Sequence, residues 1–388
     1  MIDHEMLWSN LRSFRRDLHE NPEFGFDEHR TSGLVAARLR ACGFTDIEER
    51  VGGTGVIARL RSGTGPGAIA LRADMDCLHI TEAGEHAHRS TKPGLMHACG
   101  HDGHTVMLLG AAEILAAERG FDGSVVFIFQ PAEEWGKGAR AMLDGGLRER
   151  FPYSEIYGLH NLPGLAAGKF ATRAGPAMSA EDNFEIVLRG VGGHAARPHS
   201  TNEVLVAACT IVTTLQTIVA RRLDPIDTAV VSVTELTTDG TRNVLPGEAR
   251  ILGDARSFRP QVSGRIEEQM RAIASGIASA YNCEATVDYQ RSFVSLQNDP
   301  AATTVAVRAA STVFGAENVD GECDPITASE DFAQFLADGP GNFGFIGNGE
   351  HSPPLHNPLF DFNDEVIPLG VQYFVELAKQ RLPTSAAD

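Results

Sequence analysis

The sequence predicts an α/β fold with two domains, and three observations lead to that prediction. The chain has 388 residues, more than one simple hydrophobic core accommodates. Short apolar stretches alternate with longer amphipathic ones, which is typical of a mixed, mostly parallel sheet covered by helices on both faces. The pattern changes near residue 180, so we expect a domain of residues 180–297 inserted into one formed by residues 1–179 and 298–388.

The first domain begins with two predicted helices. Leu7, Leu11 and Leu18 recur with helical spacing on one face. A second helix at residues 31–42 would end at Gly43, a natural helix stop. The remaining elements that we predict are a strand at 67–74, a helix at 105–118, strands at 124–131 and 154–161, a helix at 301–315 and a strand at 342–349.

The inserted domain has a different order of elements. We predict a strand at 183–190, one long helix at 202–222, strands at 227–240 and 247–258, a helix at 261–282 and a strand at 285–293. The order βαββαβ is that of the ferredoxin-like arrangement. A unit of about 115 residues is a plausible domain size.

Composition excludes some partners. The chain has 33 Lys and Arg against 51 Asp and Glu, and a formal net charge of −18 repels phosphate backbones, so we expect no nucleic-acid partner. Neither a signal peptide nor an apolar run of membrane-spanning length is evident, so we expect no membrane partner. The six cysteines are scattered without close pairing, which indicates reduced thiols and a cytoplasmic protein.

The stretch "MHACGHDGHT" at residues 96–105 concentrates three histidines, a cysteine and an aspartate. Cys99 and His101 are two residues apart in a loop before a predicted helix, so both side chains can face one point. We expect Asp102 to cap that helix. Taken alone, the motif is also compatible with a polar loop in which the histidines have no common role.

Other metal-binding side chains follow predicted strands. Glu133 and Glu134 follow the strand at 124–131, and His160 lies at the end of the next. Asp74 and Asp76 end an earlier strand, and His356 follows the last. Open α/β sheets bind ligands beyond the carboxyl ends of their strands. A solvated acidic rim would explain any one of these pieces but not all of them together.

The number of candidate ligands favours two metal ions over one. A closed structural zinc site takes four ligands, whereas Cys99, His101, Glu134, His160 and His356 offer five. Five ligands fit two neighbouring divalent ions with a shared ligand and an activated water. Sulfur and imidazole suit zinc, and the carboxylate also admits manganese, cobalt or nickel. Of the two adjacent glutamates, one would bind metal while the other acts as general base.

Nine motifs together resemble one family: "RRDLHENPEFGFDEHRTS", "LRADMD", "MHACGHDGHT", "QPAEE", "GLHN", "GVGGHAARPH", "RNVLPGEA", "SEDFA" and "HNPLFDFND". The chain resembles the dinuclear-metal amidohydrolases that include hippurate hydrolases, N-acyl-amino-acid amidohydrolases and auxin-conjugate hydrolases. The resemblance covers nearly the whole chain. It implies a metallopeptidase-like catalytic domain, with the inserted domain acting as lid and as the interface of a homodimer or higher homo-oligomer.

The resemblance also implies roles for single residues. It makes Cys99, His101, Glu134, His160 and His356 the metal ligands, with Cys99 as the bridge, and Glu133 the general base. Asp76 would orient a group beside the metals. Asp74 stands where relatives without the cysteine have a ligand histidine, and we do not expect it to bind metal here.

Three residues of the inserted domain also receive roles. The resemblance makes His194 the residue that stabilises the oxyanion and Asn243 a substrate contact, while Arg256 is a candidate for binding a substrate carboxylate. One departure from the family is "DCLHI", which stands where relatives have "DALPI". His104 is expected to be structural, and no role is predicted for His86 or His88.

These observations predict a metal-dependent amidohydrolase. It would cleave the amide bond of N-acyl amino acids or similar small amides by a metal-activated water. A metallo-exopeptidase, either a dipeptidase or a carboxypeptidase, would share the same site. A non-catalytic metal-binding protein of the same fold and a cysteine hydrolase built on Cys99 are further alternatives.

Overall fold

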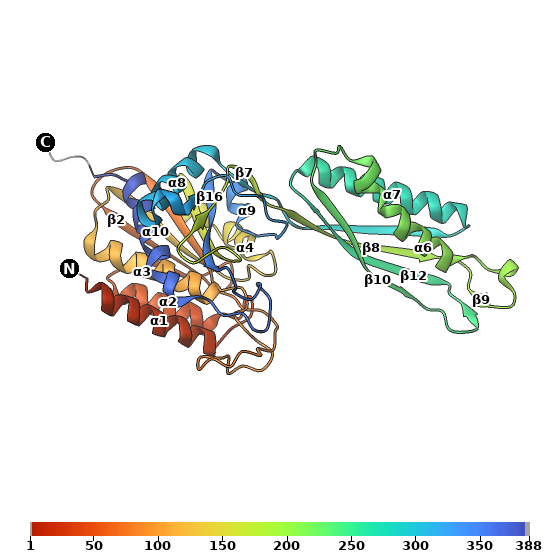
Figure 1. The fold of residues 1–388 in the computed structure, drawn as a ribbon, viewed down its shortest axis with the longest axis horizontal. Helices are drawn as coiled ribbons and strands as arrows, with labels where there is room; N and C mark the ends of the chain where they lie inside the picture. The colour runs from red at the N-terminus through yellow and green to blue at the C-terminus, as the bar shows by residue number, and fades with distance from the viewer. Residues whose placement is uncertain (1, 385–388) are drawn as a thin grey trace. The chain divides into compact units, whose positions relative to one another are not determined.

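The computed structural model describes residues 2–384, which form two compact units (Figure 1). The first unit contains the described residues up to Ala177, Gln297–Asp324 and those from Asp331 onward. The second contains Met178–Leu296 and Pro325–Glu330. The sequence had assigned this last segment to the first domain, and the functional division into catalytic and lid domains stays a prediction.

An eight-stranded sheet forms the centre of the first unit, in the order β1-β2-β4-β3-β5-β16-β6-β15. Its strands are β1 (Asp46–Val51), β2 (Gly55–Ser62), β3 (Ala68–Asp74), β4 (Gly123–Gln130), β5 (Glu155–Pro163), β6 (Phe170–Ala171), β15 (Val319–Asp320) and β16 (Gly341–Gly349). The four central strands β4, β3, β5 and β16 pair in parallel, each with the next in that order. Strand β2 pairs antiparallel with both β1 and β4. The prediction of a mixed, mostly parallel sheet is confirmed, and the carboxyl ends of the central strands meet at one edge.

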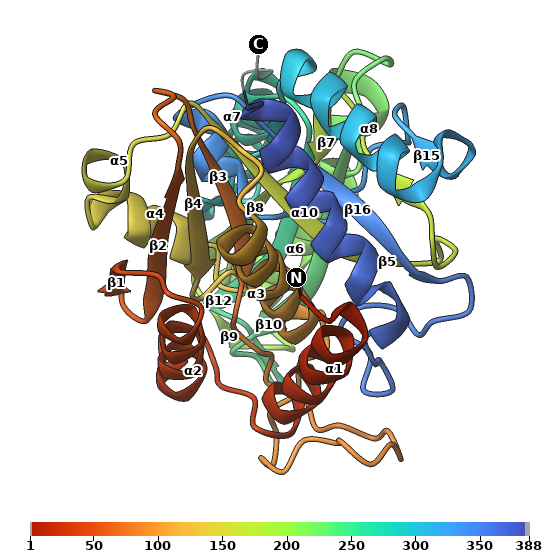
Figure 2. The ribbon, with the colours of Figure 1, turned by 90° about the vertical axis from the view of Figure 1, so that its left-hand side faces the viewer.

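Helices cover this sheet (Figure 2). They are α1 (His4–Glu20), α2 (His29–Ala41), α3 (His101–Glu118), α4 (Gly138–Asp144), α5 (Leu147–Arg150), α8 (Pro300–Phe314), α9 (Ala333–Ala337) and α10 (Ile367–Arg381), with 3-10 turns η3 (Ala316–Asn318) and η4 (Asp364–Val366). The apolar stripe of α1 is buried as predicted, because Leu7, Leu11 and Leu18 join the main core. Helix α3 is buried almost all round, since α1, α2 and α10 pack on it and β3 lies beneath it.

The predicted capping of α3 by Asp102 is wrong. The helix begins at His101, its N-cap is Gly100, and no side chain caps it. Gly100 has a φ of +91°, a left-handed conformation that glycine adopts without strain. The chain therefore enters the helix two residues earlier than the sequence suggested, and both His101 and Asp102 lie in its first turn.

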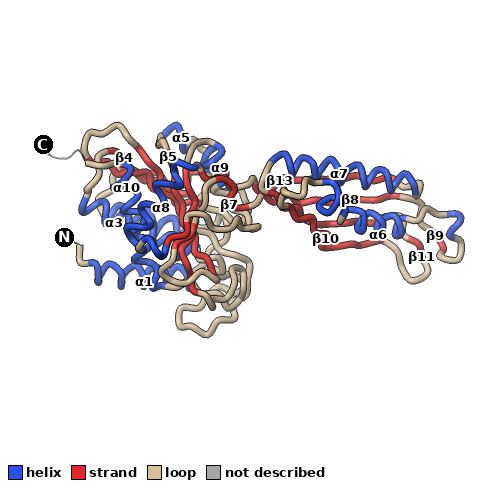
Figure 3. The backbone as a smooth tube through the Cα atoms, turned by 45° about the horizontal axis from the view of Figure 1, so that its top comes forward, coloured by secondary structure: helices blue, strands red, loops and turns tan. Residues whose placement is uncertain are grey.

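The second unit contains the predicted ferredoxin-like arrangement (Figure 3). Its elements are β8 (Ala180–Arg189), β9 (Gly193–His194), η1 (Pro198–Ser200), α6 (Val204–Leu215), η2 (Ile218–Arg222), β10 (Ala229–Thr238), β11 (Val244–Leu245), β12 (Glu248–Ser257), α7 (Pro260–Ala280) and β13 (Glu284–Phe293). The antiparallel sheet has the order β10-β12-β8-β13, and α6 and α7 pack on it. The order of helices and strands agrees with the sequence-based prediction.

One helix of this unit is shorter than predicted. The single long helix expected at 202–222 is α6, which ends at Leu215, followed by a π-helical turn at Ile218–Arg222. Strands β7 (Gly175–Met178) and β14 (Leu296–Asn298) form a small sheet where the chain passes between units. Within residues 2–384, no helix is long and apolar enough to cross a membrane. All six cysteines are free thiols.

Candidate metal centre

The carboxyl edge of the central strands gathers the side chains that the sequence predicts as metal ligands. His160 lies near the end of β5, and Glu134 follows β4. Cys99 and His101 stand at the start of α3, and His356 lies in the loop after β16. Four of these five side chains are at least nine-tenths buried, and that of His356 is about half exposed, at 53%. Segments far apart in the sequence thus converge here because parallel strands end at one edge.

The five residues form two overlapping groups. In one group, Cys99, His101 and His160 have ligand atoms within 4.8 Å of one another, and in the other, Cys99, Glu134 and His356 do. The distance from Cys99 Sγ to His160 Nε2 is 3.4 Å, and that from Glu134 Oε1 to His356 Nε2 is also 3.4 Å. Cys99 belongs to both groups, which is the position that a bridging ligand of two ions would occupy.

Buried polar atoms test whether these residues fit metal ions. Among the described residues, His101 Nε2 and Glu134 Oε1 are buried and have no hydrogen-bond partner, although they lie 3.9 Å apart. Burying such atoms without a partner costs about 1–3 kcal/mol each. Metal coordination would satisfy both, so the donor set fits a dinuclear centre.

The state of the histidines also suits metal binding. His160 Nδ1 donates to the carbonyl of Asn161 at 2.7 Å, which leaves a lone pair on Nε2 facing Cys99. Burial lowers the pKa of His160 well below its usual range, so the ring stays neutral. For His101, burial opposes the charged form, but Asp74, Asp76 and Glu134 raise its pKa to about 10. That excess of negative charge is what divalent cations would neutralise.

Asp76 orients two candidate ligands at once. Its Oδ1 accepts from His101 Nδ1 at 3.1 Å, which turns His101 Nε2 towards the centre. Its Oδ2 accepts from the backbone N–H of Glu134 at 3.0 Å. Asp74 is bound instead by Arg72 at 2.8 Å and by His104 at 2.7 Å. The roles expected for Asp76, His104 and Asp74 stay predictions, since Asp74, His101 and His104 also place ligand atoms within 4.8 Å of one another.

Glu133 is buried beside the two groups. Its Oε1 accepts from the backbone N–H of Asp331 at 3.2 Å, and its Oε2 lies 4.0 Å from His101 Nε2. Sequence reasoning named no role for Asp331, which also accepts from Gln130 at 2.7 Å and from the backbone N–H of Ala139 at 2.9 Å. Asp331 belongs to the "SEDFA" motif, but the sequence alone does not show that this segment lies beside Glu133.

Two residues of the centre, the candidate ligand His356 and Ala132 beside Glu133, have a strained backbone. His356 and Ala132 have φ values of 62° and 48°, in the left-handed region that non-glycine residues rarely adopt. Such a conformation costs about 1–3 kcal/mol and persists where the surroundings hold it. The backbone N–H of His356 donates to the carbonyl of Ala98, and that of Ala132 to Glu28 Oε1, both at 2.8 Å. These hydrogen bonds fix the loops that carry His356 and Glu133.

The three remaining predicted site residues lie in the second unit. His194 on β9 and Asn243 are both exposed. The two residues are neighbours, since the carbonyl of Asn243 accepts a hydrogen bond from the N–H of Ala195 at 3.0 Å. Arg256 on β12 is bound by Glu181 at 2.9 Å and by Ser329 at 2.8 Å. The roles of these residues stay predictions, and for Arg256 the ion pair competes with a substrate carboxylate.

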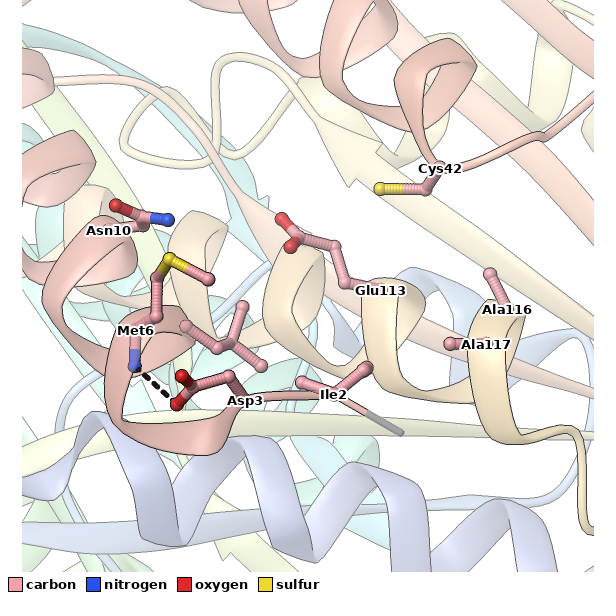
Figure 4. Close-up of a pocket in the computed structure, with 9 residues that line it drawn as sticks. Ile2, Asp3, Met6, Asn10, Cys42, Glu113, Ala116 and Ala117 are labelled. Atoms are coloured by element: carbon pink, nitrogen blue, oxygen red, sulfur yellow. Dashed lines mark hydrogen bonds between the residues drawn. The ribbon is translucent and has the colours of Figure 1, made fainter.

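A hollow of about 360 Å³ lies elsewhere in the first unit, between α1 and α3 (Figure 4). It contains Asp3, Glu113 and Cys42, and burial raises the pKa of the Cys42 thiol to about 11. A thiol with that pKa is a poor nucleophile at neutral pH. The hollow therefore lacks the reactive groups that the strand edge provides.

Comparisons with known proteins agree with this geometry. Residues 70–380 match the model of Peptidase family M20/M25/M40. The chain is 38% identical over 377 residues to an IAA-amino acid hydrolase of Arabidopsis thaliana, covering 95% of this chain and 84% of that protein. It is 36% identical over 376 residues to the hippurate hydrolase of Campylobacter jejuni, covering 97% of each. The crystal structure of the Bacillus subtilis YXEP protein, described as a dinuclear metal binding peptidase, superposes with a TM-score of 0.84 at 34% identity, covering 98% of this chain and 99% of that one.

The α/β fold and the paired ligand groups define a metal-dependent hydrolase of amide bonds. Within that class, the chain belongs to Peptidase family M20/M25/M40.

Proposed function

We propose that this enzyme hydrolyses the amide bond of N-acyl amino acids or similar small amides. The observation that carries the proposal is the overlap of the two ligand groups at Cys99, with Glu133 buried beside them. The names of the two relatives describe hydrolases of an acyl–amino-acid bond, which supports this substrate class.

The proposed ligands are Cys99, His101, Glu134, His160 and His356, and the cofactor is a pair of divalent ions. Zinc or manganese suits this mixture of sulfur, imidazole and carboxylate best, and cobalt and nickel are also compatible. Bound there, the ions would supply Lewis acidity and make a water molecule a stronger nucleophile at neutral pH.

In this proposal, Glu133 moves the proton. Its carboxylate accepts a proton from the attacking water at Oε2 and returns it to the departing nitrogen, so the products are a carboxylic acid and an amine. The N–H of Asp331 holds Oε1 and thereby fixes the direction of Oε2. Asp76 is a positioning residue, because it holds His101 and the backbone of Glu134 and would not touch the substrate.

Replacing Glu133 by Gln tests the proposal. The amide keeps the size of the side chain but accepts no proton, so we expect unchanged metal content and a fall in kcat of at least about 10²-fold. Metal analysis and kinetics on N-acyl amino acids would be run together, with Glu85→Gln as the control because Glu85 is an exposed carboxylate. Normal turnover in the Gln variant would remove Glu133 from the mechanism.

A metallo-exopeptidase acting on dipeptides or C-terminal residues is the second candidate function, and the description of the YXEP protein as a peptidase favours it. It requires the same centre and differs only in the substrate pocket. Comparing kcat/KM on N-acyl amino acids and on dipeptides decides between the two. Activity that survives chelators but is lost on alkylation would instead indicate a cysteine hydrolase built on Cys99.

We also propose a homodimer formed through the inserted domain. The second unit exposes apolar side chains, among them Leu205 and Val206 on α6 and Val230 and Leu236 on β10. Several large apolar side chains exposed on one domain are a common feature of interfaces. Light scattering of the wild-type protein and of a Leu205→Glu/Val206→Glu variant tests this, with loss of the dimer expected in the variant. The free state of all six cysteines is consistent with the predicted cytoplasmic location.

A further inference from the structure

A second group of metal-binding side chains lies in the first unit, away from the five proposed ligands. It consists of His19, near the end of α1, and of Glu82 and His86, in the loop between β3 and α3. Their ligand atoms lie within 4.8 Å of one another. His19 Nε2 is 3.3 Å from Glu82 Oε1, and His86 Nε2 is 2.7 Å from that same oxygen.

The orientation of His19 is fixed from behind. Its Nδ1 lies 2.8 Å from Asp102 Oδ2, and both side chains are fully buried. A carboxylate that accepts a hydrogen bond from one ring nitrogen directs the other nitrogen outward with its lone pair, which is the usual support for a metal-binding histidine. In His19 that second nitrogen faces Glu82.

His86 and Glu82 approach each other without forming a hydrogen bond. His86 Nε2 is buried and has no hydrogen-bond partner among the described residues, despite its short distance to Glu82. Two ligand atoms that lie side by side without pointing at each other can both face a third atom. Glu82 is itself held in place, because its Oε2 accepts from the N–H of Ser90 at 2.6 Å.

The surrounding charges leave room for a divalent cation. Arg15 is fully buried and contacts Asp102, Asp361 and Asp364, and Arg16 also binds Asp364. Together with Glu82, the cluster has four carboxylates against two guanidinium groups. Two negative charges therefore remain when the histidines are neutral, and one divalent ion would balance them.

Solvent borders this position at His86, whose side chain is 20% exposed, whereas those of His19 and Glu82 are 0% and 2% exposed. Glu82 and His86 line a hollow of about 860 Å³ formed by the segment 81–94. Water could therefore complete the coordination of an ion that has three protein ligands, as in open zinc sites. His88 lies nearby but is engaged by Asp361 at 3.0 Å and by Arg15 at 3.1 Å, so we do not include it among the ligands.

We propose that His19, Glu82 and His86 form a third metal site for an ion of the zinc class, which ties the loop 81–94 to helix α1. The two imidazoles and one carboxylate are ligands that suit zinc. The loop leads directly into the segment that contains Cys99 and His101. The ion would have a structural role, because its ligands and the hollow beside them are separate from Glu133.

Zinc stoichiometry tests this site. The metal-free protein would be titrated with Zn²⁺ alone and analysed after gel filtration, with His86→Asn as the test variant. Glu85→Gln, an exposed carboxylate of the same loop, and His199→Asn, an exposed histidine of the second unit, are matched controls. We expect three zinc ions per chain in the wild type and in both controls, and two in His86→Asn.

Trypsin provides an independent readout. Arg89 is exposed within the loop, so cleavage after it reports the mobility of this segment. Zinc should slow this cleavage at least several-fold in the wild type and in Glu85→Gln, but not in His86→Asn. The proposal is overturned if His86→Asn binds as much zinc as the wild type, or if either control loses the same equivalent. If His86→Asn retains two zinc equivalents, the dinuclear centre is intact and the lost equivalent belonged to the third site.

Discussion

The two histidine–carboxylate clusters of the first unit use the same pairing of groups but are built on different elements. In the proposed dinuclear centre Asp76 supports His101, and in the second cluster Asp102 supports His19. The first cluster stands where parallel strands end, whereas the second joins the end of one helix to one loop. His101 and Asp102 are consecutive residues in the first turn of α3, so this single buried turn supports both clusters.

The largest expected effect comes from removing the ligand that both groups of the dinuclear centre share. Cys99→Ala should lower the zinc content by close to two equivalents and reduce kcat by more than about 10³-fold, since the metal-dependent chemistry is lost. His356→Ala, which removes a ligand of one group only, should lose close to one equivalent. Metal analysis and initial rates check both.

The same variants sharpen the comparison between the clusters. Cys99→Ala should retain the equivalent that depends on His86, because the two clusters have no ligand in common. Loss of only one equivalent in Cys99→Ala, with the same loss in His356→Ala, would contradict a bridging role for Cys99.

Alanine substitutions at two glycines distinguish the cost of backbone strain from the cost of close packing. Gly100 and Gly94 both have left-handed φ values, of 91° and 78°. A Cβ on Gly100 would meet Asn161 Oδ1 at 2.2 Å, whereas a Cβ on Gly94 would meet nothing within 4 Å. Gly94→Ala should therefore cost about 1 kcal/mol, and Gly100→Ala more than about 3 kcal/mol. Denaturant unfolding of both variants measures the difference, and equal losses would refute the packing argument.

The two clusters also differ in how far the sequence predicts them. Glu134 follows one apolar strand and His160 lies near the end of the next. Strands alternating with helices predict a parallel sheet, so the convergence of these two residues at one edge followed from the pattern. His19 and Glu82 are 63 residues apart, and neither of them lies at the end of a strand. Their contact depends on how α1 packs on α3, which local sequence does not encode. We therefore predicted no role for His86.

The fold itself was predicted better than its local details. Short apolar runs predicted the central strands, and β4 is indeed buried along its whole length. Alternating and helical patterns predicted the ferredoxin-like order of the second unit, because its elements are buried on one face. The start of α3 was mispredicted because Asp102, a good capping residue, was preferred to Gly100. The break after Leu215 was missed because the apolar pattern continues through it.

Removing the charge of Asp76 or of Asp102, the two carboxylates that hold a ligand histidine, should have a smaller effect, each on the zinc affinity of its own site. Asp76→Asn should weaken zinc binding at the dinuclear centre by about 10- to 100-fold and leave the third site unchanged. Asp102→Asn should do the reverse, because Asp102 contacts His19. Competition with a fluorescent zinc chelator measures both affinities, and circular dichroism verifies folding. An Asp102→Asn variant with wild-type zinc affinity at every site would argue against metal binding by His19.

The last comparison concerns Glu28, a buried carboxylate in a different environment from Asp102. His19 and Arg15 hold the pKa of Asp102 well below its usual range, although burial opposes this. Glu28 instead accepts hydrogen bonds from neutral donors, the hydroxyl of Thr54 and the N–H of Ala132. Burial raises the pKa of Glu28 from 4.5 to about 7. The comparison shows that the charged partner, and not burial alone, sets the direction of the shift.

The direction of this shift determines how stability changes with pH. Between about pH 4.5 and 7, the folded protein binds a proton at Glu28 that the unfolded chain releases, so the contribution of Glu28 to stability falls as pH rises. Glu28→Gln cannot ionise and should lose that fall, which the pKa change puts at about 3 kcal/mol at most. Urea unfolding at pH 5 and pH 8 should show the variant gaining on the wild type at the higher pH. An exposed-carboxylate control, Glu85→Gln, should show no such gain, and a constant difference between Glu28→Gln and wild type would mean that Glu28 titrates normally.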